Sequence, residues 1–546
     1  MIWLLLAACE VEKTPEPAVF STELRADDDA PLLPLAAPRL ARRISLDLRG
    51  VLPTVAELDR VEADPAALDG LVAQWLADPR LEARMVHLLS ERWHTKVDEF
   101  LMFYWEYQEL AGDDLQEYPF ESAIGEEPLR LLAHVIVTDQ PWGEVVRADW
   151  TMANPLLASI WPIERPEGEG WQVSRYTDGR PAAGVLATNG LWWRYYTTHS
   201  NLNRARAAAI SRLLICEDYL ARPVAFSSDL ALEDSAGINQ ALRTNPYCQG
   251  CHSSMDPMAA ALFGFWPAGE HATQEMDHYH PEREQLSTWL AGAEPGWFGK
   301  PVSGLEELGS TIAEDPRFAR CAAESFASLL WRRDVGVGDV ARVEALRQSY
   351  LAGDQKIKPL LKAITQTAVY RAGSLSAEAS PAQQEAEATE RLLGASLLSS
   401  SIEDLTGFVW EEEGFPQLDN DTWGFRILGG GVDGAYVTRP QATPGATWVL
   451  VTQRLAEAAV ATAVPAHYAG GDNRLLELAP GLPSTDPAFA AELDRLHWRL
   501  YGQRPDATWQ AAIRSLYDGV FAVEGEQAAW QAVLIAMLRD PLFVSY

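Results

Sequence analysis

The chain has 546 residues and a formal net charge of −33, with 47% hydrophobic residues and 20 tryptophans. This length predicts several domains, and the apolar content is sufficient for large buried cores. The strong negative charge argues against a nucleic-acid partner, because the phosphates would be repelled by the surface.

The first residues have the pattern of a bacterial lipoprotein signal. Residues 1–9 form an apolar run that ends in Leu-Ala-Ala-Cys9, although it is very short and has no Lys or Arg before it. We expect Cys9 to carry the lipid and residues 10–38, rich in Pro, Glu, Asp and Ala, to form a flexible tether. The protein would then be extracytoplasmic, in the periplasm or at the outer membrane, and would contact the membrane only through its lipid anchor.

Residues 39–154 are predicted to form an N-terminal helical domain. Thr54 is followed three positions later by Glu57, which is the pattern of a capping box at the start of a helix. An apolar helical stripe then ends at Asp78-Pro79. Asp-Pro pairs also follow apolar helical runs at residues 315–316 and 540–541, which indicates three related helix pairs.

Residues 155–300 have weak periodicity, so we expect a loop-rich region with few short strands. Within it lies Cys248-Gln-Gly-Cys251-His252, the one Cys-x-x-Cys-His of the sequence. Two thiols at this spacing can bond to the two vinyl groups of a haem, and the adjoining imidazole then ligates the iron. The motif predicts one covalent haem c held by Cys248, Cys251 and His252.

Three other interpretations of this motif stay open. A structural zinc site would normally need a second Cys/His pair, and no other cysteines stand at metal spacing. A redox dithiol would normally begin a helix within a βαβ pattern, which the sequence does not show. The third alternative is a disulfide turn between Cys248 and Cys251.

A haem at this motif would need a sixth iron ligand or an open position. Met255 is only three residues from His252, too near to reach the other haem face, whereas Met276 has the necessary separation. We take Met276 as the candidate distal ligand. Further candidates are Met152 and the histidine cluster His271, His278 and His280. The same histidines, with neighbouring carboxylates, could instead form a separate divalent-metal site.

Two cysteines remain once lipid and haem are assigned. Cys216 and Cys321 could form a disulfide in an oxidising compartment, and two buried free thiols are the alternative.

The rest of the chain, from residue 301 onward, is predicted to be helical. Residues 301–372 would pack on the haem region, residues 373–390 would be a linker, and residues 391–546 would form a C-terminal helical domain. Asp419-Asn420-Asp421 does not fit the EF-hand calcium loop, and the glycine run at 429–431 lacks the ending of a phosphate-binding loop. The expected fold class is mainly α.

Four stretches resemble the Planctomycete-type cytochrome C-like surface protein families. They are RRISLDLRGVLPTVAEL from residue 42, PWGEVVRADWTMAN from 141, NPYCQGCHSSMDPMAAALFGF from 245 and GKPVSGLEELGSTIAEDPRFARCAAESF from 299. The third is the most specific, because Cys-x-x-Cys-His is followed by Met-Asp-Pro and an apolar helix. The resemblance implies a cytochrome-like protein without a particular reaction. The family pattern also has cysteines where Cys216 and Cys321 stand, which favours a bridge between them.

These observations favour electron transfer to an unknown redox partner at the cell envelope. An extracytoplasmic enzyme acting on a polymer or an oxidisable substrate is the first alternative. A structural or docking lipoprotein, with zinc or a disulfide at the Cys-x-x-Cys-His, is the second.

Overall fold

The computed structural model describes residues 32–102, 106–107, 110, 117–222, 235–267, 273–379, 390–471 and 474–546. The predicted mainly α fold is confirmed, and the strands of the described residues form short two-stranded antiparallel sheets. Cys9, most of the expected tether and His271 lie outside the described residues. Within those residues, no helix combines the length and apolar character needed to cross a membrane.

The N-terminal helices begin after a strand, β1 (Leu32–Pro34), and their bounds are α1 (Ala37–Arg49), α2 (Val55–Ala63), α3 (Ala67–Trp75), α4 (Arg80–Trp93) and α5 (Glu117–Val137). The predicted capping box at α2 is confirmed. The Glu57 backbone N–H donates to Thr54 Oγ1 over 3.2 Å, and the Thr54 N–H donates to Glu57 Oε2 over 2.7 Å. Two backbone donors that the helix itself cannot satisfy are thereby paired.

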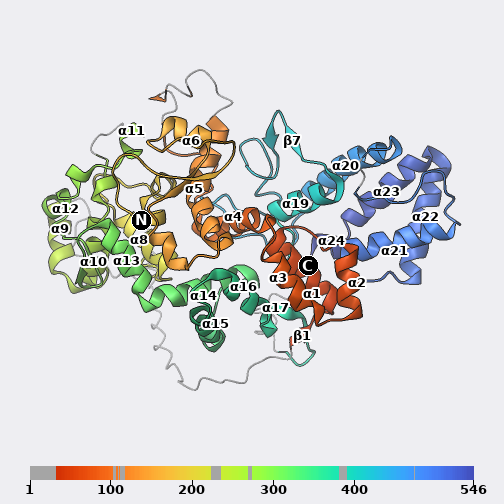
Figure 1. Cartoon of the computed structure of the whole chain (residues 1–546), viewed down its shortest axis with the longest axis horizontal. Helices are drawn as coiled ribbons and strands as arrows, with labels where there is room; N and C mark the ends of the chain where they lie inside the picture. Colours follow the sequence, from red (N-terminus) through yellow and green to blue (C-terminus); the bar gives the residue numbers. More distant parts are fainter. Residues whose placement is uncertain are drawn as a thin grey trace, which may run out of the picture.

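The middle of the chain has shorter elements and more loops. They are η3 (Trp142–Val146), β2 (Thr151–Ala153), α6 (Pro155–Ile160), β3 (Gln172–Ser174), η4 (Gly184–Ala187), α7 (Asn189–Arg194), α8 (Arg204–Leu214), α9 (Ser235–Thr244), α10 (Pro246–Ala260), η5 (Phe263–Phe265), α11 (Thr273–Met276), η6 (Pro281–Arg283), α12 (Leu286–Leu290), β4 (Gly296–Trp297) and β5 (Lys300–Pro301). These elements lie at the end of the molecule opposite the C-terminal helices (Figure 1).

A second series of helices follows and returns towards α1. It comprises α13 (Leu305–Glu314), α14 (Pro316–Trp331), η7 (Val337–Asp339), α15 (Val340–Ala352), α16 (Ile357–Thr365), α17 (Ala368–Arg371) and β6 (Ala372–Leu375). Strand β6 pairs with β1, so residues near both ends of this half of the chain meet in one sheet.

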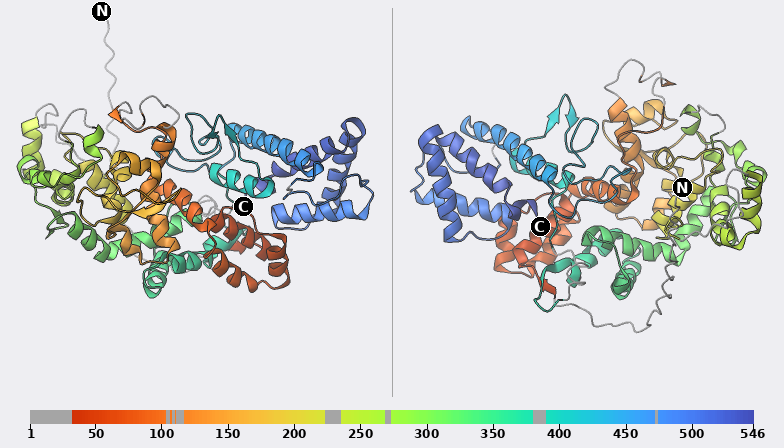
Figure 2. Two further views of the ribbon diagram at one scale, coloured as in Figure 1. Left: turned by 45° about the horizontal axis from the view of Figure 1, so that its top comes forward. Right: turned by 180° about the vertical axis from the view of Figure 1, so that it is seen from behind.

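The C-terminal part is again helical, with bounds α19 (Ala395–Thr406), β7 (Glu411–Glu412), β8 (Phe415–Pro416), α20 (Ala446–Tyr468), α21 (Pro487–Tyr501), α22 (Ala507–Glu524), α23 (Glu526–Leu538) and α24 (Pro541–Val544). Helices α20 to α23 form one end of the elongated molecule, as the views in Figure 2 show.

Helix α1 connects the two halves because it is buried on all sides. Leu40, Ile44 and Leu48 belong to a core cluster that extends to Tyr370, whereas Leu46 belongs to a second cluster built from residues 393–546. A third, smaller cluster surrounds Phe120 at the N-terminal part of α5. Burial on every face is unusual for a helix in a globular protein and marks α1 as the central element.

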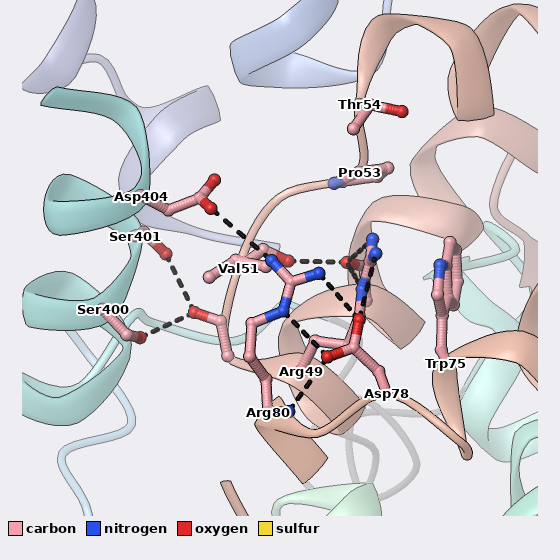
Figure 3. A network of polar contacts seen from close by, with 12 residues as sticks. Arg49, Val51, Pro53, Thr54, Trp75, Asp78, Arg80, Ser400, Ser401 and Asp404 are labelled. Carbon is pink, nitrogen blue, oxygen red and sulfur yellow. Dashed lines mark hydrogen bonds and ion pairs between the residues drawn. The ribbon is translucent and has the colours of Figure 1, made fainter. Parts of the chain in front are cut away.

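The turn after α1 and the corner between α3 and α4 are both bonded to α19 by a polar network (Figure 3). Ser400 Oγ donates to the Gly50 carbonyl over 2.6 Å. Arg80 forms ion pairs with Asp78 at 2.7 Å and with Asp404 of α19 at 3.5 Å. The turn after α1 and the start of α4 therefore pack on α19 through polar contacts.

Candidate functional site

The Cys-x-x-Cys-His motif lies in the first two turns of α10. Asn245 is the N-cap, its side chain accepting the Tyr247 backbone N–H over 2.9 Å, and Pro246 occupies the first helical position. The helix therefore begins two residues before Cys248, where the sequence predicted a helix only after the motif. Because Cys248, Cys251 and His252 follow the i, i+3, i+4 spacing, they share one face.

Both thiols of the motif are free and half-buried. Cys251 packs at the edge of the first core cluster, and Met255, one turn later, is buried in the same cluster. The motif helix is thus anchored by its C-terminal half, while its first turns stand at the surface. This arrangement leaves the two sulfur atoms unbonded and close to solvent.

The imidazole of His252 is held by a carboxylate. Its Nδ1 lies 2.9 Å from Asp256 Oδ1, one turn further along α10. Asp256 is in turn bound by one edge of the Arg204 guanidinium: Nε donates to Oδ1 over 2.8 Å and Nη2 to Oδ2 over 3.1 Å. With Asp256 as a hydrogen-bond acceptor, we assign the proton of neutral His252 to Nδ1, and Nε2 keeps its lone pair for a metal.

Charge balance keeps Asp256 ionised. Burial by itself would raise the pKa of this carboxyl, but the hydrogen bonds from His252 and Arg204 outweigh burial and hold the pKa below its ordinary value. All three side chains are largely buried, with 15–20% of each exposed. An ionised Asp256 is the acceptor that a metal-ligating histidine commonly has behind it.

A disulfide fixes the helix that carries Arg204. Helix α8 ends near Cys216, which is bonded to Cys321 of α14 with an S–S distance of 2.13 Å and a Cα–Cα distance of 5.2 Å. The bridge connects α8, whose Arg204 binds Asp256 of α10, to α14. Tyr219 then reaches α10, where its hydroxyl lies 2.7 Å from Ser254 Oγ.

Strand β4 covers the C-terminal half of α10. A Cβ on Gly296 would lie 3.2 Å from the Pro257 Cβ and equally close to the Lys300 carbonyl oxygen, so any larger residue would push its neighbours back by a few tenths of an ångström. The neighbouring Trp297 donates from Nε1 to Asp315, the N-cap of α14, over 2.8 Å. In the Met-Asp-Pro that follows the motif, Met255 and Pro257 therefore pack against neighbouring elements, and Asp256 binds His252.

The candidates for a distal ligand are in different environments. Met276 is buried in the third core cluster, whereas the motif packs on the first. Met152 is buried in the first cluster. His280 is bonded within its own segment, its Nε2 lying 2.9 Å from the Glu275 carbonyl, and His278 is exposed. The burial of Met276 favours a packing role, and its ligation stays a prediction.

The acidic run Asp419-Asn420-Asp421 is committed to protein contacts. Among the described residues, no group of three or more His, Cys, Asp and Glu side chains is arranged to hold a metal ion. Asp419 pairs with Lys96 at 2.6 Å, and Asp421 accepts the Ile427 N–H over 2.6 Å. These contacts occupy carboxylate oxygens that a calcium loop would need.

Comparison with known proteins gives one match. A family model described as "Protein of unknown function (DUF1585)" matches residues 298–370, which span β5, α13 to α16 and most of α17. This part of the chain is similar to that family, and the match begins after the motif helix. No curated protein and no solved structure matches the chain.

Sequence reasoning did not identify Asp256 or Arg204 as parts of the site. The first was detectable, because a carboxylate four residues after a histidine on a helix faces it. Arg204 is 52 residues from Asp256 in the sequence, and no local pattern indicates that the two would meet.

Proposed function

We propose that this chain is an extracytoplasmic c-type cytochrome-like electron carrier, with one haem bonded through Cys248 and Cys251 and its iron ligated by His252. The observation that carries the proposal is the Arg204–Asp256–His252 chain of hydrogen bonds, which orients the imidazole beside two free thiols. A covalently bound haem supplies one-electron transfer at an iron whose potential depends on its ligands and their hydrogen bonds.

The residues of the site fit a covalently bound haem. Each thiol is half-buried and free, so both can form thioether bonds without first breaking a disulfide. Asp256 fixes the tautomer and ring orientation of His252, and Arg204 compensates the carboxylate charge at a partly buried position. The disulfide between Cys216 and Cys321 holds the helix that bears Arg204. Export to an oxidising compartment, where haem c is attached, would also suit this disulfide.

A haem-stained denaturing gel tests the proposal. The full chain would be expressed with a cytochrome c maturation system, beside the Cys248→Ala/Cys251→Ala double variant. We expect a stained band that is absent from this variant. The matched control is Cys216→Ser/Cys321→Ser, which also removes two cysteines and should keep the stain. A folded wild-type chain without stain would contradict the proposal.

The distal ligand is tested separately. If Met276 ligates the iron, Met276→Leu will change the visible absorption spectrum of the haem protein. An unchanged spectrum would leave Met276 with its packing role and remove it as the ligand.

The same preparation addresses the two alternatives. Turnover with peroxide or an oxidisable donor would favour the enzyme. A folded chain that lacks haem but holds one equivalent of zinc, lost in Cys248→Ala/Cys251→Ala, would favour the structural or docking lipoprotein.

A further inference from the structure

A cavity of about 530 Å³ lies where α4, α8 and α14 meet segments 390–392 and 438–442. Its size is within the range of small-molecule sites, which are commonly 300–1,000 Å³. Its walls contain segments distant in sequence, so it exists only in the folded chain. Of the helices that contribute to it, α4 lies near the centre of the molecule (Figure 1).

The charge of this cavity is opposite to that of the whole chain. Six arginines and three carboxylates line it, so its walls have a net charge of +3 in a chain of net charge −33. The arginines are Arg92, Arg212, Arg332, Arg333, Arg391 and Arg439. A concave surface with an excess of positive charge concentrates negatively charged ligands.

Two of these arginines have no carboxylate partner within ion-pair distance in the described part of the chain. Arg92 donates from Nη2 to the Arg212 carbonyl over 3.3 Å and to Cys216 Sγ over 3.0 Å, and its Nε has no hydrogen-bond partner. Arg212 donates to the Tyr195 hydroxyl over 2.7 Å. Burial first, and then the nearby Arg212 charge, lower the pKa of Arg92 to about 10.

A third arginine is also incompletely satisfied. Arg391 is 3% exposed and forms an ion pair with Asp47 at 2.9 Å, but its Nε and Nη2 have no hydrogen-bond partner in the described residues. Buried guanidinium groups without enough carboxylate partners are costly, and a bound anion beside them would offset their positive charge.

We propose that this cavity binds a small organic or inorganic anion with more than one negative charge, built from carboxylate, sulfate or phosphate groups. Arg92 and Arg212 contact the anion from one wall, and Arg439 approaches it from the rim, where its side chain is 78% exposed. Guanidinium groups suit all three acidic groups because they can donate two parallel hydrogen bonds. This site is independent of the proposed haem.

Calorimetric titration of the full chain tests the proposal. The probes are citrate, inorganic sulfate and inorganic phosphate, each at the same ionic strength set with NaCl, so that general screening is held constant. We expect saturable binding of at least one probe, and the probe bound most tightly identifies the acidic group. Arg212→Gln should weaken binding about tenfold or more, which corresponds to about 1.4 kcal/mol.

The matched control is Arg347→Gln, which removes an arginine paired with Glu344 on α15, away from the cavity, and should leave the affinity unchanged. Arg212→Lys keeps the charge and should retain more affinity than Arg212→Gln, which separates a lost contact from a folding defect. The proposal is overturned if no probe binds beyond the NaCl control, or if folded Arg212→Gln binds as tightly as the wild type.

Discussion

At the scale of single residues, the charge of Asp256 is the feature that distinguishes this site. In the proposed haem site, Cys248, Cys251 and His252 would supply the groups for covalent attachment and ligation, but they do not fix the direction of the imidazole. Asp256 does so by accepting from Nδ1 at 2.9 Å, and Arg204 holds Asp256 in turn. A carboxylate behind a ligating histidine also makes the imidazole a stronger donor to the metal.

Replacement of this carboxylate should change the potential without removing the haem. We expect Asp256→Asn to keep the stained band and to raise the midpoint potential by tens of millivolts, because a weaker donor stabilises the oxidised iron less. Redox titration of the purified protein measures the change. Asp315→Asn, which removes another arginine-paired carboxylate but keeps an N-cap, should leave the potential unchanged. Equal potentials for the wild type and Asp256→Asn would contradict the role given to Asp256.

The site shows which residue roles can be predicted from sequence. The motif residues were identified because the chemistry of haem attachment fixes their spacing within five positions. Arg204, Arg212 and Arg391 were not identified, because their roles depend on packing between segments far apart in the chain. Single arginines in such segments carry no periodic or spacing signal.

At the scale of elements, the Asp-Pro pairs are helix starts as well as helix stops. Asp315 and Asp540 are N-caps whose side chains accept the backbone N–H two residues on, and proline occupies the first helical position in each case. Asp486-Pro487 begins α21 in the same way and was not recognised in the sequence. Such local signals made the helical class predictable, whereas the β1–β6 pairing, between residues about 340 apart, was not.

The disulfide is predicted to be the strongest single link between elements. It closes a loop of 105 residues, for which loop entropy predicts a stabilisation of about 4–5 kcal/mol. Cys216→Ser/Cys321→Ser should lower the free energy of unfolding by roughly this amount in urea denaturation. A loss below about 1 kcal/mol would show that the bridge adds little to the fold.

The capping box at α2 is expected to contribute less stability than the disulfide does. Thr54→Ala removes the acceptor for the Glu57 N–H and should cost about 1 kcal/mol of stability. Thr54→Ser keeps a hydroxyl and serves as the control. The same denaturation assay measures both, and equal stability of the Ala and Ser variants would contradict the importance of the cap.

At the scale of the whole molecule, α1 joins both halves through buried polar side chains. Arg42 donates to the carbonyls of Leu500, Phe543 and Ser545 over 2.5–2.9 Å. Asp47 accepts from the hydroxyls of Tyr370 and Tyr546 over 2.8 and 2.9 Å, and pairs with Arg391. These contacts connect α1 to α17 and to the C-terminal end of the chain.

Loss of the Asp47 charge should destabilise the molecule as a unit. Asp47→Ala would leave Arg391 and two buried hydroxyls without their acceptor, and breaking a buried pair in this way typically costs about 3–5 kcal/mol. Glu57→Ala, which removes a half-buried carboxylate paired with Arg49, should cost less. Thermal unfolding measures the melting temperatures of both variants and of the wild type. Near-equal melting temperatures for Asp47→Ala and the wild type would contradict the central role of α1.

Acid should weaken the contact between α5 and Lys96, in the segment that follows α4. Burial would raise the pKa of Glu126, but Lys96 and Arg130 outweigh burial and lower the pKa to about 2. Because the folded pKa is below the unfolded value, the stabilisation, on the order of 3 kcal/mol, is present above about pH 4.5 and is lost as the pH falls towards 2. Unfolding free energies of the wild type and Glu126→Gln should converge over this window. A constant difference between them would contradict the lowered pKa.

Covalent attachment of haem through both thiols is most directly tested by the absorption spectrum of the denatured protein in alkaline pyridine. This spectrum reports how many haem vinyl groups have been converted to thioethers. We predict one haem per chain with both vinyl groups saturated, and one unsaturated vinyl group in each of the single variants Cys248→Ala and Cys251→Ala. Haem that extracts into acidic organic solvent, or no haem in the folded wild type, would contradict the assignment of Cys248, Cys251 and His252.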